Sequence, residues 1–361
     1  MRRALVLFTD IYYSNQHIKE KGIINMRILV DAMGGDNAPD EIVKGCVEAI
    51  NLKQGFEIEL LGDRKKIEKC FADKQFDRSR IIITETCDDV TNYDKPSEAI
   101  RKKKNSSLVV GMKKIKDNAA HAFISAGNTG AILAASLLIA GRIKGIVRPA
   151  LAPIVPSING PVMIIDAGMN TRIKPISYLQ FAVMGTEYMR VRYGMENPRV
   201  GLLNIGTEEN KGNEIHRQAY DILKKSQVNF IGNIEGKDVP EGNVDIVVCD
   251  GFVGNAMLKV MEGTGKYFFN HLGNIYSRSI WGRISYLLVK HELKKIKKQV
   301  DPEEIGGTPI LGVNGIVFKC HGNSKAKAIK NTILNACNVK YQSIMEQVKN
   351  SFVQMKTNVQ T

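Results

Sequence analysis

Residues 121–140 read HAFISAGNTGAILAASLLIA. A short, mostly apolar run, His121–Ile124, leads through Ser125 into the glycine-rich turn AGNTG, and the apolar stretch Ala131–Ala140 follows. A buried strand that runs directly into a helix is the building unit of α/β proteins. The segment therefore predicts a strand, a tight loop and a helix, in that order.

Five further segments repeat this order of apolar run, polar residue and turn. Their apolar runs are Arg27–Val30, Val162–Ile165, Val200–Leu203, Val244–Cys249 and Ile316–Lys319. Such runs, alternating with helices, predict a three-layer α/β/α fold with a mostly parallel sheet. Ligands bind outside the carboxyl ends of the strands in these sheets, so we expect the six following loops to converge on one crevice.

Charge and cysteine content narrow the function classes. The chain has 361 residues, and its 51 Lys and Arg exceed its 37 Asp and Glu, which gives a net charge of +14. This excess favours acidic or phosphorylated partners. The six cysteines lack the close spacing of zinc or redox sites, which predicts reduced thiols and a cytoplasmic location. No apolar run approaches the roughly 20 residues needed to span a bilayer.

The loops after the predicted strands have a composition suited to anion binding. Glycines allow close backbone approach, and the N-terminus of the following helix offers free N–H groups. For one loop alone, helix capping by Asn128, Thr129 or Asn255 is the favoured explanation. For AGNTG, IGTEENKG and GFVGN together, phosphate binding is favoured. No P-loop, GxGxxG or GxSxG motif occurs, which argues against an ATPase, an ordinary dinucleotide site and a serine hydrolase.

Titratable residues in these loops are few. His321 is the only one of six histidines in a predicted crevice loop, where it could act in acid–base chemistry or lie at the core edge. Asp31, Asp166 and Asp250 end strands and could bind Mg²⁺, but no ligand spacing requires it, and we predict no metal or other cofactor. For Asp166 we predict that the carboxylate holds loop N–H groups.

Two basic stretches lie outside the loops. Residues 101–104 read RKKK, which fits a solvated helix face or a docking patch for an acidic partner. Residues 275–298 combine lysines with apolar residues at helical spacing. This pattern fits a helix at a membrane surface, or one that packs in a core or dimer with its lysines solvated. The candidate membrane contacts are Trp281, Ile284, Leu287 and Leu288.

Several long strings resemble the phosphate acyltransferase family. They include DAMGGDNAP at 31–39, ISAGNTGA at 124–131, RVGLLNIGTEENKGNE at 199–214 and DIVVCDGFVGNAMLK at 245–259. The resemblance runs from 26 to about 348, with a helical protrusion at about 268–300. We expect residues 1–25 to be a dispensable extension and residues 349–361 to be a C-terminal tail.

The resemblance implies a fold similar to isopropylmalate dehydrogenase and phosphotransacetylase. It also implies transfer of a long-chain acyl group from acyl carrier protein to inorganic phosphate, giving acyl phosphate for phospholipid synthesis. The expected enzyme is a cytoplasmic homodimer that needs no cofactor and binds no nucleic acid. It would associate peripherally with the inner face of the cell membrane and supply a membrane glycerol-3-phosphate acyltransferase.

This chemistry needs positioning and oxyanion stabilisation more than a strong base, because phosphate is already charged and a thiolate leaves readily. The predicted catalytic residues are Lys211, His321, Asn204 and Asp250. The predicted phosphate or oxyanion ligands are Gly127, Asn128, Thr129, Gly206, Thr207, Gly254 and Asn255. Asp31 and Asp36 are expected to order the first loop. The alternatives are an acyltransferase that uses coenzyme A thioesters, a non-catalytic lipid or nucleic-acid binding module, and a decarboxylating dehydrogenase.

Overall fold

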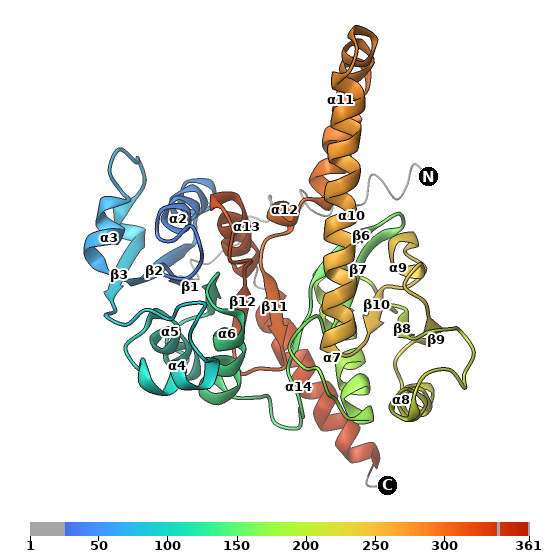
Figure 1. The fold of residues 1–361 in the computed structure, drawn as a ribbon. Coiled ribbons are helices and arrows are strands. Elements are labelled where there is room, and N and C mark those ends of the chain that lie inside the picture. Colours follow the sequence, from blue (N-terminus) through green and yellow to red (C-terminus); the bar gives the residue numbers. More distant parts are fainter. Residues whose placement is uncertain (1–25, 338–339, 360–361) are drawn as a thin grey trace.

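The structure is a computed structural model that describes residues 26–337 and 340–359 (Figure 1). The predicted extension at 1–25 lies outside the described residues. A seven-stranded sheet forms the first lobe, and a five-stranded sheet forms the second. Both are mostly parallel and covered by helices, so the predicted three-layer α/β/α class is confirmed.

The first sheet has the order β3-β2-β1-β4-β12-β11-β5. Its parallel strands are β3 (Ile81–Glu85), β2 (Phe56–Gly62), β1 (Met26–Asp31), β4 (Ala122–Ser125) and β12 (Ile316–Lys319). Two more strands complete it: β11 (Thr308–Leu311) runs antiparallel to β12, and β5 (Ala150–Leu151) runs antiparallel to β11.

Strand β1 shows why this sheet is covered on both faces. Ile28 and Val30 belong to one hydrophobic cluster and Leu29 to another, and all three side chains are buried. Successive strand residues point to opposite faces, so an unbroken apolar run requires helices on each side. One face carries α2 (Asp40–Leu52) and α13 (Ala326–Ala336), and the other carries α5 (Ser107–Lys116) and α6 (Thr129–Ala135), which continues as a π-helical turn at Ser136–Ala140. Smaller elements on the same lobe are α3 (Arg64–Lys69), the 3₁₀ turn η2 (Arg78–Arg80) and α4 (Pro96–Lys102).

The second sheet has the order β6-β7-β10-β8-β9. Its strands are β6 (Ile154–Ser157), β7 (Gly160–Ile165), β10 (Ile246–Val248), β8 (Val200–Leu203) and β9 (Phe230–Ile234), and only β6 is antiparallel to its neighbour. The strands are thus divided between two sheets, where the sequence pattern predicts one. The chain crosses between them at Ala152 and Pro153, and proline has no N–H with which to continue a ladder.

Helix α7 (Pro175–Tyr193) lies between the two sheets and is buried along most of its length. Helix α14 (Lys340–Val359) packs against it through Ile344, Val348 and Phe352. The segment predicted as a tail at 349–361 therefore begins as part of a packed helix. The second lobe also carries α8 (Glu214–Lys224) and the single turn α9 (Asp238–Glu241).

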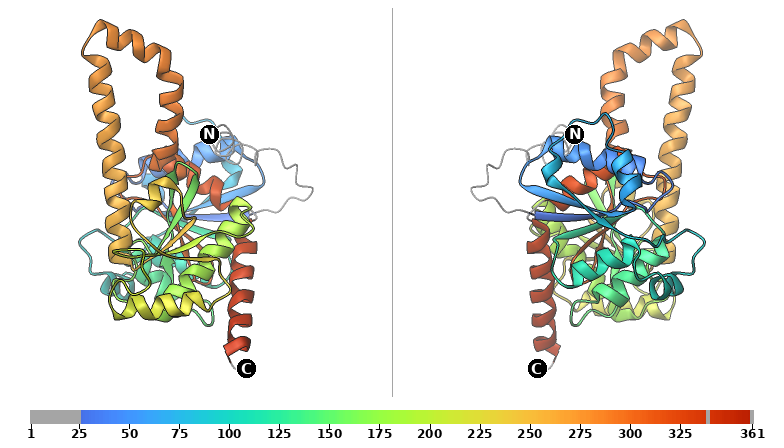
Figure 2. Two further views of the ribbon diagram at one scale, coloured as in Figure 1. Left: turned by 90° about the vertical axis from the view of Figure 1, so that its right-hand side faces the viewer. Right: turned by 90° about the vertical axis from the view of Figure 1, so that its left-hand side faces the viewer.

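A long helical hairpin projects from the second lobe (Figures 1 and 2). Its arms are α10 (Gly251–Ser277) and α11 (Ile280–Val300), and the chain returns to the body through the turn α12 (Pro302–Ile305). The Ser279 hydroxyl caps α11 by accepting the Gly282 N–H. The protrusion predicted at 268–300 is therefore the outer part of this hairpin. No helix in the described part of the chain is long and apolar enough to cross a bilayer.

Candidate active site between the lobes

Three loops of the first lobe meet at the carboxyl ends of β1, β4 and β12. Asp31 accepts a hydrogen bond from the Ser125 hydroxyl at 2.7 Å, and the Asp36 N–H donates to the Gly322 carbonyl at 2.8 Å. Burial raises the pKa of Asp31, although hydrogen bonds from serine hydroxyls and loop N–H groups oppose this shift. The carboxylate of Asp31 thus joins the first two loops, and the backbone of Asp36 joins the first to the third.

Glycine is required where these loops touch. A Cβ atom at Gly34 would lie 2.4 Å from the Asp31 Oδ2 and 2.9 Å from the Gly127 nitrogen. No side chain fits at such distances, so the GG pair at 34–35 is explained by packing between loops. The Gly127 N–H itself donates to the Ser125 hydroxyl at 3.1 Å.

Asn128 and Thr129 lie at the start of α6. The Asn128 Oδ1 accepts the Ala131 N–H at 3.0 Å, and its Nδ2 donates to the Thr91 carbonyl at 3.0 Å. The side chain of Asn128 is therefore engaged as a helix cap, the alternative that the sequence left open. Thr129 is exposed. A phosphate-binding role for these two residues stays a prediction.

Asp166 organises the loops of the second lobe. Its carboxylate accepts the N–H groups of Leu151, Met169 and Asn170 at 2.6–3.2 Å. The prediction that Asp166 holds loop N–H groups is confirmed. Burial raises its pKa to about 6 despite these hydrogen bonds.

The loop after β10 forms the N-terminus of α10. Asp250 Oδ1 accepts the N–H groups of Phe252 and Val253 at 2.8 and 3.0 Å, so its side chain caps the helix. A Cβ atom at Gly254 would lie 1.9 Å from the Asp166 carbonyl oxygen, which makes glycine obligatory there. Asn255 lies in the second turn of α10, beside Gly168.

The loop after β8 holds the remaining predicted residues. Asn204 Nδ2 donates to the Lys211 carbonyl and to the Asn233 Oδ1, both at 3.1 Å. Lys211 Nζ lies 3.5 Å from the Glu208 Oε1; the Lys211 side chain is half-buried and that of Glu208 is exposed. Gly206 is buried under this ion pair and Thr207 is exposed. The loop is well ordered by its own contacts, and its catalytic role stays a prediction.

The two lobes meet at a cluster of charged side chains between β12 and α10. His321 Nε2 lies 3.4 Å from Glu262 Oε1, and Lys259 Nζ lies 2.7 Å from Glu262 Oε2. Lys319 lies at the end of β12, where the positive charge of Lys259 lowers its pKa and the negative charge of Glu262 raises it. The site thus contains two lysines, one histidine and one carboxylate. We name these four residues, Lys259, Glu262, Lys319 and His321, the interlobe cluster.

Electrostatics in the interlobe cluster favour an added anion. Burial lowers the pKa of Lys319, and the nearby positive charge of Lys259 lowers it further. Burial alone would raise the pKa of Glu262, but hydrogen bonds from His321 and Lys259 hold it at about 2. One carboxylate therefore faces two lysines and a histidine, and an incoming phosphate would balance the excess positive charge.

Sequence reasoning identified His321 but missed the other three members. A signal was present, because Asn255, Lys259 and Glu262 follow one another at intervals of four and three residues and so share a face of α10. Lys319 was noted only as the end of a strand. Among the described residues, no group of three or more His, Cys, Asp and Glu side chains could hold a metal ion.

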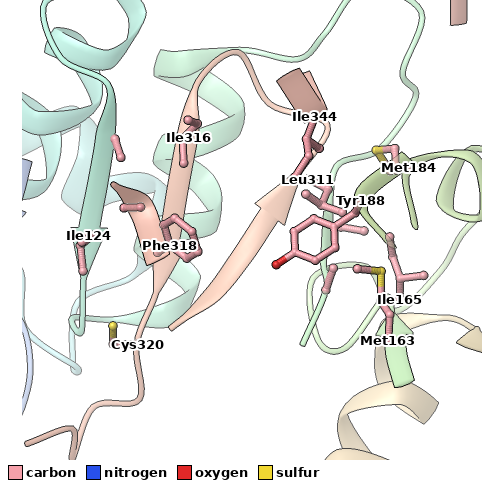
Figure 3. Packing of buried hydrophobic residues seen from close by; sticks show 14 of the residues in the cluster. Ile124, Met163, Ile165, Met184, Tyr188, Leu311, Ile316, Phe318, Cys320 and Ile344 are labelled. Atoms are coloured by element: carbon pink, nitrogen blue, oxygen red, sulfur yellow. The ribbon is translucent and has the colours of Figure 1, made fainter. Parts of the chain in front are cut away.

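A cavity of about 630 Å³ opens beside the interlobe cluster, with His321 and Glu262 in its wall. The rest of the wall is mostly apolar and comes from α10, β6, α12, β11 and the C-terminal end of α7. Figure 3 shows the core around β11, where Cys320 lies near the start of the strand and Tyr188 lies near its end, beside Leu311. The wall of the cavity therefore combines a few polar side chains, among them His321, Glu262 and Arg192, with a mostly apolar remainder.

A family profile and the sequences of known proteins both match nearly the whole chain. The profile of a family described as fatty acid synthesis protein matches residues 26–347. A phosphate acyltransferase of Acetivibrio thermocellus is 48% identical over 331 residues, covering 92% of this chain and 98% of that protein. A phosphate acyltransferase of Thermoanaerobacter pseudethanolicus is 47% identical over 330 residues, covering 91% and 98%.

Solved structures with a similar fold are much more distant in sequence. A phosphotransacetylase from Streptococcus pyogenes superposes with a TM-score of 0.59 at 15% identity, covering 93% of this chain and 98% of that one. The EutD phosphotransacetylase from Staphylococcus aureus gives 0.57 at 12% identity, covering 96% and 99%. At this identity the likeness shows the fold alone, and it agrees with the fold that the sequence resemblance implied.

Proposed function

Because the chain belongs to the phosphate acyltransferase family, we propose that it transfers a long-chain acyl group from acyl carrier protein to inorganic phosphate. The chain is an acyltransferase, so the alternatives of a non-catalytic binding module and a dehydrogenase are set aside. The observation that carries the proposal is the interlobe cluster, which joins two lysines and a histidine beside an apolar cavity.

The reaction proceeds by direct attack of a phosphate oxygen on the thioester carbonyl carbon. The new C–O bond forms, the C–S bond breaks, and the pantetheine sulfur leaves as a thiolate. Phosphate is already anionic near pH 7, and a thiol has a pKa of about 8.5, so neither partner needs strong activation. The enzyme supplies position and charge stabilisation, and no acyl-enzyme forms.

The interlobe cluster provides these functions in our proposal. Lys259 and Lys319 bind the phosphate oxygens, and His321 donates a hydrogen bond to the carbonyl oxygen or a proton to the departing sulfur. Glu262 is a positioning residue, because it holds both Lys259 and His321. Lys211, Asn204 and the glycine loops remain candidates for the far side of the bound substrate.

The acyl donor in this proposal is an acidic carrier protein. A net charge of +14 steers such a partner toward the enzyme and makes the encounter sensitive to salt. The basic segment 101–104 and the lysines of α11 are the candidate docking surfaces. Coenzyme A thioesters are the competing donor, since solved phosphotransacetylases share the fold.

We also propose that the enzyme is a homodimer that works at the cytoplasmic face of the membrane. The outer part of the hairpin exposes Trp281, Leu287 and Leu288 at 75%, 68% and 83% of their surface, and lysines follow along α11. Such a surface suits peripheral contact with anionic lipid. Ile284 is less exposed, at 45%. Acyl phosphate released there would reach a membrane glycerol-3-phosphate acyltransferase.

The test is a phosphate-dependent transfer assay with two donors. Purified protein is incubated with phosphate and either palmitoyl-acyl carrier protein or palmitoyl-coenzyme A, and acyl phosphate is trapped as the hydroxamate. Product from the carrier protein alone supports the proposal. Product only from coenzyme A would move the assignment to a phosphotransacetylase-like enzyme, and no product from either would overturn it. Lys259→Ala should lose activity, whereas Lys266→Ala, on an exposed part of the same helix, should not.

A further inference from the structure

The cavity beside the interlobe cluster is unexplained by phosphate binding. Its volume of about 630 Å³ is far larger than a phosphate ion needs and falls in the range of small-molecule sites. The wall includes the apolar side chains of Ile154, Val155, Met257, Leu258, Met261 and Ile305. An apolar space of this size next to charged groups suits a ligand with one polar end and one long apolar end.

We propose that this cavity holds the acyl chain of the substrate and that its wall at Gly265 sets the chain length the enzyme accepts. The inference rests on the proposed function, because it takes the thioester carbonyl to lie at His321 and Glu262. From there the chain would extend past Met261 toward Gly265, both of which line the cavity. Occupation by the substrate itself is favoured because His321 and Glu262, two members of the candidate catalytic cluster, form part of the cavity wall.

Helix α10 contributes a glycine, Gly265, to the cavity wall. Gly265 is one helical turn beyond Glu262 and lies in the cavity wall, and a Cβ atom there would meet no other atom within 4 Å. The glycine therefore leaves space that a side chain could occupy without a clash. Gly263, on the same helix, has equally open surroundings but is exposed and does not line the cavity. The two glycines form a matched pair.

The experiment compares Gly265→Phe with Gly263→Phe. Each buried methylene contributes about a fourfold gain in affinity, so a ring that displaces several of them should lower transfer of palmitoyl groups about tenfold or more. Transfer of acetyl groups should change little, and Gly263→Phe should keep the wild-type preference. Equal losses for palmitoyl and acetyl groups in Gly265→Phe, or no loss for either, would overturn the inference.

A binding measurement separates this inference from the proposed function. The fluorescent fatty acid cis-parinaric acid should bind to wild type and Gly263→Phe about tenfold or more tightly than to Gly265→Phe. If no acyl transfer is found but this pattern holds, the cavity assignment stands and the proposed function fails. If all three proteins bind the probe equally, the cavity assignment fails whatever the activity. A change of oligomeric state in Gly265→Phe without a change in probe binding would instead assign the cavity to a contact between subunits.

Discussion

His321 and Glu262 come from different lobes, and the histidine Nε2 lies 3.4 Å from the carboxylate Oε1. His321 follows β12 of the first sheet, whereas Glu262 lies on the fourth turn of α10 in the second lobe. Neither lobe alone contains this pair. The proposed site is therefore assembled by the packing of one lobe against the other.

Replacing Glu262 by Gln tests whether this carboxylate positions the histidine. The neutral amide keeps the size of the side chain but weakens its hold on His321 and Lys259, so we expect kcat to fall about tenfold to a hundredfold with a smaller change in the KM for acyl donor. Steady-state kinetics measure this split. Glu292→Gln, which breaks an exposed ion pair with Lys295 on α11, is the control and should leave kcat unchanged. Equal kcat values in the two variants would contradict the role.

Replacing Lys319 by Met tests phosphate binding. Lys319 is largely buried and its pKa is lowered, so removing its charge should not destabilise the fold. We expect the KM for phosphate to rise about tenfold or more while the Tm stays constant or increases. Lys266→Met is the matched control. A normal KM for phosphate in Lys319→Met would remove this lysine from the binding site.

Alanine substitutions at two glycines of α10 should change stability in opposite directions. At Gly254 the new Cβ would lie 1.9 Å from the Asp166 carbonyl oxygen, so we expect a loss of about 3 kcal/mol or more. At Gly263 the surroundings are open and alanine is the better helix former, so a gain of up to about 1 kcal/mol is expected. Urea denaturation measures both. Similar midpoints for the two variants would show that the close contact at Gly254 is wrong.

Ionisation of Asp166 should lower the free energy of unfolding as the pH rises from about 4 to about 6. Its folded-state pKa is about 6, above the usual 3.9 of an unfolded Asp, so the folded protein binds more protons in this window. The free energy of unfolding should fall by up to about 3 kcal/mol across it. Asp166→Asn should be less stable overall, because its amide cannot accept every loop N–H, but its profile should be flatter. Parallel profiles for wild type and variant would exclude this cause.

Leu287→Glu together with Leu288→Glu tests the hairpin surface. Both side chains are exposed, and two added carboxylates should prevent insertion among lipid headgroups. We expect binding to anionic vesicles to be abolished and turnover of soluble donor to be spared. Co-sedimentation is the measurement, and Ile158→Glu, at an exposed apolar residue in the turn between β6 and β7, is the control. Unchanged co-sedimentation of the double variant would exclude this surface.

The sequence contained enough to predict the strands that end in glycine-rich loops. Val162–Ile165 and Ile316–Phe318 are unbroken apolar runs, and such runs indicate buried parallel strands directly. The short antiparallel strand β5, by contrast, has only two residues, Ala150 and Leu151, and no periodicity can identify it. The division into two sheets depends on these short strands, and the sequence pattern did not predict it.

Some residues of the candidate site could likewise be predicted from the sequence, and others could not. Loop residues such as Asp166 and Asp250 were found because they immediately follow the apolar runs Val162–Ile165 and Val244–Cys249. Lys259 and Glu262 were missed because they lie two and three turns into a helix, and their importance depends on which residues of the other lobe they face. Local sequence cannot specify that distant packing.

Helix α10 is one continuous helix of 27 residues, roughly 40 Å long, that carries Lys259 and Glu262 of the interlobe cluster and ends near the hairpin tip. A push or tilt applied at the tip would therefore reach Lys259 and Glu262 through continuous helix backbone. Gly263 and Gly273, where an added Cβ would meet no other atom within 4 Å, are the points where this helix would bend first. A contact at the far end of the hairpin would thus be coupled through one helix, α10, to the positions of Lys259 and Glu262.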